Sequence, residues 1–416
     1  MNRKISKVAV LGSGIMGSGI ACHFANIGVE VLLLDITPKK LNETEIKKNL
    51  SIDSKVVKNR IVNEMFNKCI KSKPSPIYNK KFLNRVQLGN YDDDIKKISE
   101  ADWIIEVVVE KLSIKKTIFD LVEKHRAEGT IVTSNTSGIP IKLMNEGRSD
   151  DFKKHFAITH FFNPPRYLNL FEVIPGPNCD KDILDFLIKY GEDFLGKTSV
   201  LAKDTPAFIG NRIGIYGIMS LFHQLKDGGF SIEEIDKFTG PAIGRPKSAT
   251  FRTADIAGID TLCHVANGVY DNCINDESRD VFKLPDFLKT MLDKKMLGSK
   301  TNQGFYKKIK GKNGKSKILS LDLKTFEYKD QKKVNYETLN NARKCKNRDE
   351  KFKLLIKGDD RAADFYRENF ARMFGYVQNR IPEISNDIVK IDSAMKTGFG
   401  WKEGPFEIWN YIGIKE

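Results

Sequence analysis

The chain has 416 residues, of which 40% are hydrophobic and 30% charged, and its formal net charge is +15. This composition excludes a disordered chain and a miniprotein, because it supplies enough apolar side chains for two or more domain cores. A net charge this large would ordinarily suggest nucleic acid or an anionic membrane surface as a partner. Two segments hold the excess, however: residues 37–85 carry 13 basic and 4 acidic side chains, and residues 307–357 carry 17 and 6. The rest of the chain is mildly acidic, so two basic segments, and not a basic protein, need an explanation.

The six cysteines are scattered along the chain, with no Cys-x-x-Cys pair and no Cys/His cluster. This pattern favours reduced thiols in the cytoplasm and argues against a structural metal. The N-terminus lacks the long apolar stretch of a signal peptide, and no run approaches 18 apolar residues. We therefore expect a cytoplasmic protein with no membrane span and no bound metal.

The first recognisable motif follows a short β-branched stretch at residues 7–11. It is Gly12-Ser13-Gly14-Ile15-Met16-Gly17, it opens a predicted helix, and a second apolar strand at residues 29–34 then ends in Asp35. Gly12 allows a tight turn, Gly14 lets the backbone approach a pyrophosphate at the helix N-terminus, and Gly17 lets the helix pack close to the strand. Asp35 can accept hydrogen bonds from both hydroxyls of an adenosine ribose, and its charge would repel a 2′-phosphate. The pattern predicts a dinucleotide site that prefers NAD to NADP; the alternative is an ordinary glycine-rich loop.

The next segments alternate between helical and extended patterns. Residues 37–85 are lysine-rich with amphipathic spacing, and we expect them to form a helical hairpin inserted after the second strand. Strands are expected at residues 103–109, 130–133 and 156–162, with a helix at residues 114–128. Alternating strands and helices predict a parallel, doubly wound α/β sheet of the Rossmann type.

After residue 200 the pattern becomes helical, with no convincing strand before Tyr306. Residues 307–357, dominated by Lys, Asn and Asp, are predicted to be a lysine-rich linker with a turn around Gly311 to Gly314. The alternative is a nucleic-acid or membrane module, although the segment has few aromatic side chains for base stacking. The predicted domains are 1–200, a dinucleotide-binding domain; 201–306, a helical domain; 307–357, the linker; and 358–416, a further helical block.

The last block contains an internal repeat. Residues 235–244 align with residues 391–400 at an offset of 156, and residues 251–259 align with 406–414 at an offset of 155. One helical unit is therefore expected twice, with the second copy cut short.

His160 and Glu172 are the first candidates for chemistry. Asn163-Pro164-Pro165 forces a turn between them, so two extended segments can run back beside each other. A carboxylate in an apolar strand needs a partner, and an imidazole across the turn can supply one. A histidine oriented by a carboxylate can take a proton from an alcohol while hydride leaves the same carbon; the alternative is a structural hydrogen bond. Ser137, after a predicted strand, and Asn211, at the entrance to the helical domain, could join this pair or be ordinary helix caps.

Seven motifs follow one another along residues 5–306. They are Gly12 to Gly19, Glu106 to Glu110, Ser134 to Ser137, His160 to Pro164, Phe171 to Ile174, Lys203 to Pro206 with Asn211-Arg212, and Lys300-Thr301 with Gly304 to Tyr306. In this order they resemble the L-3-hydroxyacyl-CoA dehydrogenase family. Residues 376–413 look like the second C-terminal copy of its longer, multifunctional members. The resemblance implies a Rossmann-type NAD-binding domain followed by all-α C-terminal domains.

The activity that the resemblance implies is the reversible, NAD-dependent oxidation of (S)-3-hydroxyacyl-CoA to 3-oxoacyl-CoA. This is a step of fatty-acid β-oxidation or of 3-hydroxybutyryl-CoA metabolism. The alternative is a non-catalytic NAD-binding or structural protein on the same fold.

The resemblance also implies residue roles. His160 would be the general base, Glu172 would orient it, and Ser137 and Asn211 would hold the substrate oxygen. Coenzyme A would be held near residues 37–85, with lysines such as Lys48 and Lys55 steering it; the alternative is a solvated lysine face. The cofactor-binding positions would be Gly12, Gly14, Ile15, Met16, Gly17, Asp35, Glu110, Lys115, Asn163 and Lys300.

Two departures from the family pattern affect these expectations. Gly138 stands where many members have a second serine. Larger members with the Asn-Pro-Pro-Arg pattern often continue into an enoyl-CoA hydratase domain, so we expect no hydratase activity, and either a fragment or a naturally separate dehydrogenase. The expected partner is an acyl-CoA and not nucleic acid. A homodimer through the helical domain is possible by analogy with shorter members, unless the second copy occupies that surface.

Overall fold

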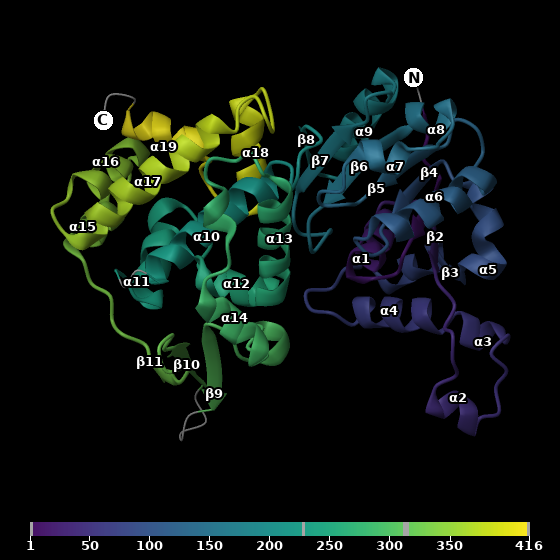
Figure 1. Cartoon of the computed structure of the whole chain (residues 1–416), viewed down its shortest axis with the longest axis horizontal. Coiled ribbons are helices and arrows are strands. Elements are labelled where there is room, and N and C mark those ends of the chain that lie inside the picture. The colour runs from purple at the N-terminus through teal and green to yellow at the C-terminus, as the bar shows by residue number, and fades with distance from the viewer. Residues whose placement is uncertain (1–2, 227–228, 311–315, 414–416) are drawn as a thin grey trace. The chain divides into compact units, whose positions relative to one another are not determined.

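Figure 1 shows the chain as a computed structural model, which describes residues 3–226, 229–310 and 316–413. The chain divides into two compact units, Met1–Phe208 and Ile209–Glu416. The division falls later than the predicted boundary near residue 200, because the segment that follows the last strand of the first unit still packs with it. For example, the Asp204 carboxylate accepts a hydrogen bond from the Ile141 backbone at 2.9 Å.

The first unit is built on one eight-stranded sheet. Its strands are β1 (Lys7–Leu11), β2 (Glu30–Asp35), β3 (Val86–Asn90), β4 (Trp103–Glu106), β5 (Ile131–Ser134), β6 (Phe156–Phe161), β7 (Leu170–Pro175) and β8 (Thr198–Leu201). The order is β3-β2-β1-β4-β5-β6-β7-β8, and β1 to β6 run parallel, so the predicted doubly wound sheet is confirmed. Strand β7 turns back antiparallel to β6, and β8 is parallel to β7. The order reverses at β1, and open α/β sheets bind ligands at the carboxyl ends of the strands beside such a point.

Helices cover both faces of this sheet. Phe24 of α1 and Leu187 of α9 belong to one buried cluster with the inward side chains of the strands. On the other face, Phe119 of α6 and Phe152 of α8 pack around Phe156 of β6, with ring centroids 5.1 to 5.6 Å apart. The helices are α1 (Ile15–Asn26), α5 (Tyr91–Asp94), α6 (Leu112–His125), α7 (Ile141–Asn145), α8 (Asp150–Lys154) and α9 (Lys181–Asp193), with a 3-10 helix at Ile95–Glu100.

The basic segment 37–85 differs from the predicted hairpin. It contains three helices, α2 (Glu43–Lys47), α3 (Lys55–Lys58) and α4 (Arg60–Ile70), and a 3-10 helix at Lys80–Arg85. Local signals divide the segment. The Asn42 side chain accepts a hydrogen bond from the Glu45 backbone at 2.9 Å and starts α2, and Asn49, with a φ of 51°, follows the end of that helix. Arg60 then donates to the Lys40 carbonyl at 2.9 Å and fixes the short helices to α4.

The second unit is helical, with α10 packed against α13, α17 and α18. No helix in the parts of the chain that the structure describes is both long and apolar enough to span a bilayer. The helices are α10 (Gly210–Lys226), α11 (Ile232–Thr239), α12 (Phe251–Ala257), α13 (Ile259–Asn272), α14 (Asp286–Asp293), α15 (Glu337–Lys344), α16 (Arg348–Lys357), α17 (Arg361–Asn379), α18 (Ile388–Gly398) and α19 (Pro405–Ile412), with 3-10 helices at Pro241–Ile243, Arg279–Phe282 and Ser299–Thr301.

Residues 307–357 form regular structure and not the predicted linker. Strands β9 (Tyr306–Lys310), β10 (Ser316–Leu321) and β11 (Tyr328–Asp330) make a small antiparallel sheet, so the C-terminal part is not entirely α-helical, and α15 and α16 follow. The linker prediction is wrong because it rests on the many lysines and overlooks a few apolar side chains: Leu321, Phe352 and Leu355 are all buried. The turn predicted around Gly311 to Gly314 lies outside the described residues.

Equivalent positions of the internal repeat share their local structure. The Asp236 carboxylate accepts hydrogen bonds from Thr250 N and Phe251 N at 2.9 and 2.7 Å, at the start of α12. The Asp392 carboxylate accepts them from Phe406 N and Glu407 N at 2.9 and 3.0 Å, at the start of α19. Left-handed glycines also recur, with Gly244 and Gly400 at φ 72° and 67° and Gly258 and Gly413 at 98° and 103°. Both copies therefore use an aspartate of one helix to cap the helix that follows.

Candidate active site

His160 and Glu172 lie directly opposite each other on the antiparallel strands β6 and β7. His160 Nδ1 is 2.7 Å from Glu172 Oε2, so the pairing expected from the turn between them is present. Their neighbours Phe161 and Phe171 point into the cluster under α1 and α9, and because side chains alternate along a strand, the pair faces the other side of the sheet. The Glu172 side chain is completely buried and the His160 side chain is 8% exposed.

The Glu172 carboxylate determines the tautomer of His160. We assign the imidazole proton to Nδ1, which donates to Glu172, and this leaves the lone pair on Nε2. The rings of Phe162 and Phe208 flank the imidazole, with centroids at 4.6 and 5.5 Å. An imidazole in this setting can accept a proton at Nε2 while the carboxylate stabilises the resulting cation.

Ser137 is held by a carboxylate between the ends of β4 and β5. Glu110 accepts hydrogen bonds from Ser137 N at 2.9 Å, Thr136 Oγ1 at 2.5 Å and Ser137 Oγ at 3.3 Å, and Lys115 Nζ lies 3.2 Å from Glu110 Oε2. Burial raises the pKa of Glu110, but the Lys115 charge and the hydrogen bonds from Thr136 and Ser137 outweigh it and hold that pKa below its usual value. Glu110 is therefore an ionised acceptor that orients Ser137.

Lys115 does not face the surface as a pocket-lining residue would. Its side chain is 1% exposed, and Nζ lies 2.8 and 2.9 Å from the two oxygens of Glu106, so its link to Ser137 runs through Glu110. Glu106 is itself fully buried and also accepts a hydrogen bond from Ser134 Oγ at 2.5 Å. The sequence motif that contains Glu106 assigns this residue no role. Its place at the end of an apolar strand is nevertheless a signal, because a carboxylate there needs a buried partner, as Glu172 does.

The glycine loop fits the pyrophosphate of a dinucleotide. Gly12 has a φ of 107°, and a Cβ there would lie 2.7 Å from the Val107 carbonyl oxygen; a Cβ on Gly17 would lie 1.8 Å from the Gly12 carbonyl oxygen. In contrast, nothing lies within 4 Å of a Cβ built on Gly14, at the N-terminus of α1. A phosphate group can therefore approach the backbone at Gly14, as the spacing of the glycines predicted.

Asp35 ends β2 beside this loop and is half-buried. Its Oδ2 accepts a hydrogen bond from Ser13 N at 2.6 Å and another from the Ser13 hydroxyl, and its Oδ1 accepts one from Ile36 N at 2.7 Å. Ile15 follows Gly14 and is 64% exposed, whereas Met16 is partly buried. The carboxylate has lone pairs left for ribose hydroxyls, so these residues fit NAD.

The remaining predicted residues belong to other segments of the chain. Asn163 is exposed in the turn between β6 and β7, and Lys48 and Lys55 are exposed beside α2 and in α3. Asn211 and Lys300 belong to the second unit: Asn211 is half-buried in the first turn of α10, and Lys300 Nζ is 2.5 Å from Asp260. Among the described residues, no group of three His, Cys, Asp or Glu side chains could hold a metal ion.

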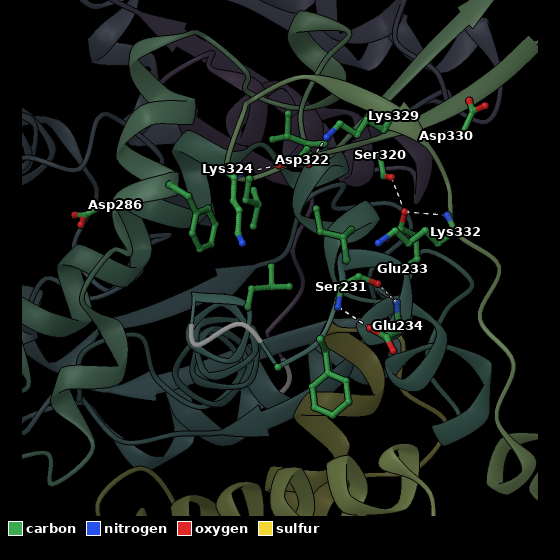
Figure 2. A pocket seen from close by; sticks show the side chains of 17 residues that line it. Ser231, Glu233, Glu234, Asp286, Ser320, Asp322, Lys324, Lys329, Asp330 and Lys332 are labelled. Atoms are coloured by element: carbon green, nitrogen blue, oxygen red, sulfur yellow. Dashed lines mark hydrogen bonds and ion pairs between the residues drawn. The ribbon is translucent and has the colours of Figure 1, made fainter.

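A cavity of about 680 Å³ opens in the second unit between β10, β11 and α11, and Figure 2 shows its walls. None of the predicted site residues lines it. Its carboxylates are engaged by the protein, since Glu233 accepts from Ser320 Oγ at 2.6 Å and Glu234 from Ser231 N at 2.8 Å. We therefore assign no catalytic residue to this cavity.

Comparison with known proteins identifies the family of both domains. Residues 7–205 match the model of the 3-hydroxyacyl-CoA dehydrogenase NAD binding domain, and residues 208–308 match that of the 3-hydroxyacyl-CoA dehydrogenase C-terminal domain. A Bacillus subtilis protein named probable 3-hydroxyacyl-CoA dehydrogenase is 51% identical over all 416 residues, which span 52% of that protein's length. A Deinococcus radiodurans protein with the same name is 39% identical over 315 residues, covering 76% of this chain and 86% of that protein. A solved Escherichia coli 3-hydroxybutyryl-CoA dehydrogenase has the same fold, with a TM-score of 0.67 and 20% identity over 97% of this chain and 90% of that one.

Proposed function

The chain belongs to the 3-hydroxyacyl-CoA dehydrogenase family, and on that premise we propose that it catalyses the reversible, NAD-dependent oxidation of (S)-3-hydroxyacyl-CoA to 3-oxoacyl-CoA. This reaction is a step of fatty-acid β-oxidation or of 3-hydroxybutyryl-CoA metabolism. The observation that carries the proposal is the 2.7 Å contact between His160 and Glu172, in the same unit as a glycine loop that fits a dinucleotide.

His160 acts as the general base. Its Nε2 takes the proton of the 3-hydroxyl group, while Glu172, which accepts the hydrogen bond from Nδ1, stabilises the imidazolium that forms. NAD supplies the acceptor for the hydride that leaves C3. In the reverse direction, the protonated imidazole donates its Nε2 proton to the 3-keto oxygen.

Ser137 and Asn211 are proposed to hold the substrate oxygen, as the family resemblance implies. Ser137 is oriented by Glu110, whose ionised form is stabilised by buried Lys115. Gly14 would receive the pyrophosphate, in a loop whose shape depends on Gly12 and Gly17, and Asp35 would receive the adenosine ribose. Ile15, Met16, Glu110, Asn163 and Lys300 are the further predicted cofactor and substrate contacts, and Lys115 acts on them through Glu110.

The acyl-CoA substrate carries several negative charges. We infer that exposed lysines between residues 37 and 85, Lys48 and Lys55 among them, steer its nucleotide end toward the first unit.

Two further predictions concern the whole protein: that it works in the cytoplasm, and that it forms a homodimer through the helical domain. Measuring the mass of the protein in solution tests the second.

The direct test is to follow NADH formation by absorbance with (S)-3-hydroxyacyl-CoA substrates from the butyryl to the hexadecanoyl chain length, each with NAD and with NADP. We expect turnover with NAD and at least ~10-fold lower activity with NADP, because of Asp35. If NAD binds but no substrate is oxidised, the chain is a non-catalytic NAD-binding protein on the same fold.

A further inference from the structure

Arg212 follows Asn211 in the first turn of α10, and its side chain is completely buried. Its Nη2 lies 2.7 Å from Asp276 Oδ2, and its Nε donates to the Tyr376 hydroxyl at 2.8 Å. The Tyr376 hydroxyl in turn donates to Asp276 Oδ2 at 2.9 Å. The guanidinium, the carboxylate and the phenol therefore form a closed triangle.

Much of this cluster comes from the second helical copy, residues 358–416. Glu383 Oε1 lies 3.1 Å from Arg212 Nη2, and Arg380 Nη1 lies 2.7 Å from Glu383 Oε2 and 3.3 Å from Asp276 Oδ2. Burial of an arginine requires such partners, because an unpaired charge out of water is strongly destabilising. The second copy thus supplies part of what allows Arg212 to be buried.

The second copy also fixes α10 by packing. A Cβ on Gly214 would come within 2.1 Å of the Phe399 ring, and one on Gly217 within 2.9 Å of the Met373 methyl group, so both side chains lie directly on the α10 backbone. The rings of Tyr216 and Tyr376 are stacked with centroids 3.6 Å apart and planes 2° from parallel. In Figure 1, α17 and α18 lie beside α10. These contacts set the rotation of α10 about its own axis.

Asn211 lies where α10 most needs such support. The first turn of a helix lacks the backbone hydrogen bonds that hold later turns, so its geometry depends on side-chain anchors. Arg212 is the residue next to Asn211, and its guanidinium is tied to Tyr376 at 2.8 Å. Burial raises the pKa of Tyr376 well above its usual value, which keeps the phenol protonated and able to donate to Asp276.

We propose that Tyr376, in the second helical copy, is a positioning residue for the dehydrogenase reaction: it anchors Arg212 and thereby aims Asn211 at the substrate oxygen. The proposal rests on the function proposed above, because the role of Asn211 comes from it. The second copy then serves the geometry of a site to which it contributes no catalytic residue.

The test compares two conservative variants of the full chain. Tyr376→Phe removes the hydroxyl but keeps the stacked ring. Tyr366→Phe, on the same helix, removes an equally buried hydroxyl that donates to the Phe238 carbonyl at 2.9 Å. We expect Tyr376→Phe to lower kcat/KM for the hydroxyacyl-CoA about 10-fold with an unchanged KM for NAD, and Tyr366→Phe to change kcat/KM by less than about 2-fold.

A double-mutant cycle with Asn211→Ala tests whether the effect of Tyr376 on turnover passes through Asn211. If Tyr376 acts through Asn211, adding Tyr376→Phe to Asn211→Ala lowers kcat/KM no further. Equal losses in Tyr366→Phe and Tyr376→Phe, or full additivity with Asn211→Ala, would overturn the proposal. If Tyr376→Phe does not fold, Glu383→Gln replaces it; this half-exposed side chain bonds the same guanidinium, and a loss of about 3-fold is expected. An inactive wild-type chain overturns the proposed function and this inference together, whereas an active wild type with an unaffected variant overturns only the inference.

Discussion

Each unit of the molecule contains a buried pair of hydrogen-bonded ionisable side chains, and the two pairs differ in what surrounds them. In the first unit, His160 stays 8% exposed and Glu172 binds only one of its ring nitrogens. In the second unit, the Arg212 and Asp276 side chains are both completely buried, with Tyr376 and Arg380 around them. A buried pair that leaves one proton-accepting atom accessible can do chemistry. A pair enclosed by further partners takes no part in proton transfer itself, so breaking the first should mainly cost activity, and breaking the second should mainly cost stability.

The largest effect is expected at His160. His160→Gln removes the only proton acceptor in the proposed reaction, so kcat should fall at least ~10³-fold, the upper range for general acid–base catalysis. NAD binding, measured by fluorescence titration, and the melting temperature should hardly change. If turnover survives, the general-base assignment is wrong.

The largest effect on stability is expected at Asp276. Asp276→Asn leaves Arg212 and Arg380 with one carboxylate fewer in a buried site, and loss of one partner from such a pair typically costs ~3–5 kcal/mol. Urea unfolding measures this loss. Glu277→Gln is the matched control, because its side chain is 46% exposed and its pair with Arg380 should contribute less than ~1 kcal/mol. Equal stability of the two variants would contradict the contrast drawn between the pairs.

Glu172 should show a smaller effect on turnover than His160. Glu172→Gln keeps the size of the side chain but removes the charge that stabilises the imidazolium, so kcat should fall about 100-fold, equivalent to ~2.7 kcal/mol. Rates at saturating NAD measure it. An unchanged kcat would mean that the pair is only structural.

The two helical copies give the smallest expected effect. Asp236→Ala and Asp392→Ala each remove a helix cap, which typically costs ~0.5–2 kcal/mol. Asp236 also accepts a hydrogen bond from the Tyr306 hydroxyl at 2.7 Å, so we expect the greater loss of melting temperature in Asp236→Ala. A greater loss of melting temperature in Asp392→Ala would contradict this expectation and show that the extra hydrogen bond of Asp236 does not set the order.

The stability that Asp236 and Asp392 contribute should also depend on pH. Burial raises the pKa of Asp236 and of Asp392 to about 6, from 3.8. Between these values the folded state binds more protons than the unfolded state, so the stability that each aspartate contributes is full below about pH 3.8 and declines as the pH rises through 6. Both alanine variants should therefore lose more stability at pH 5 than at pH 7, as thermal unfolding at the two pH values can show.

Local patterns in the sequence predicted the parts of the molecule whose geometry depends on near neighbours. The glycine loop and Asp35 follow from the spacing of one β-α-β unit, and the His160–Glu172 pair follows from one turn between two strands. The structure of residues 307–357 escaped prediction because many lysines obscured a few buried apolar side chains, among them Phe352 and Leu355. The predicted hairpin at residues 37–85 is wrong because its amphipathic pattern does not show the left-handed backbone at Asn49, which follows the short helix α2.

The sequence by itself thus determined the doubly wound sheet, the dinucleotide loop, the internal repeat and the pairing of His160 with Glu172, because each is encoded over a short stretch or a constant offset. Only the tertiary structure decided which charges meet. Lys115 lies behind Glu110 and binds Glu106, and Arg212 is anchored by Tyr376, 164 residues along the chain. The physical reason is that a buried charge must find an opposite charge or a hydrogen-bond partner, but nothing in the local pattern specifies which distant segment supplies it.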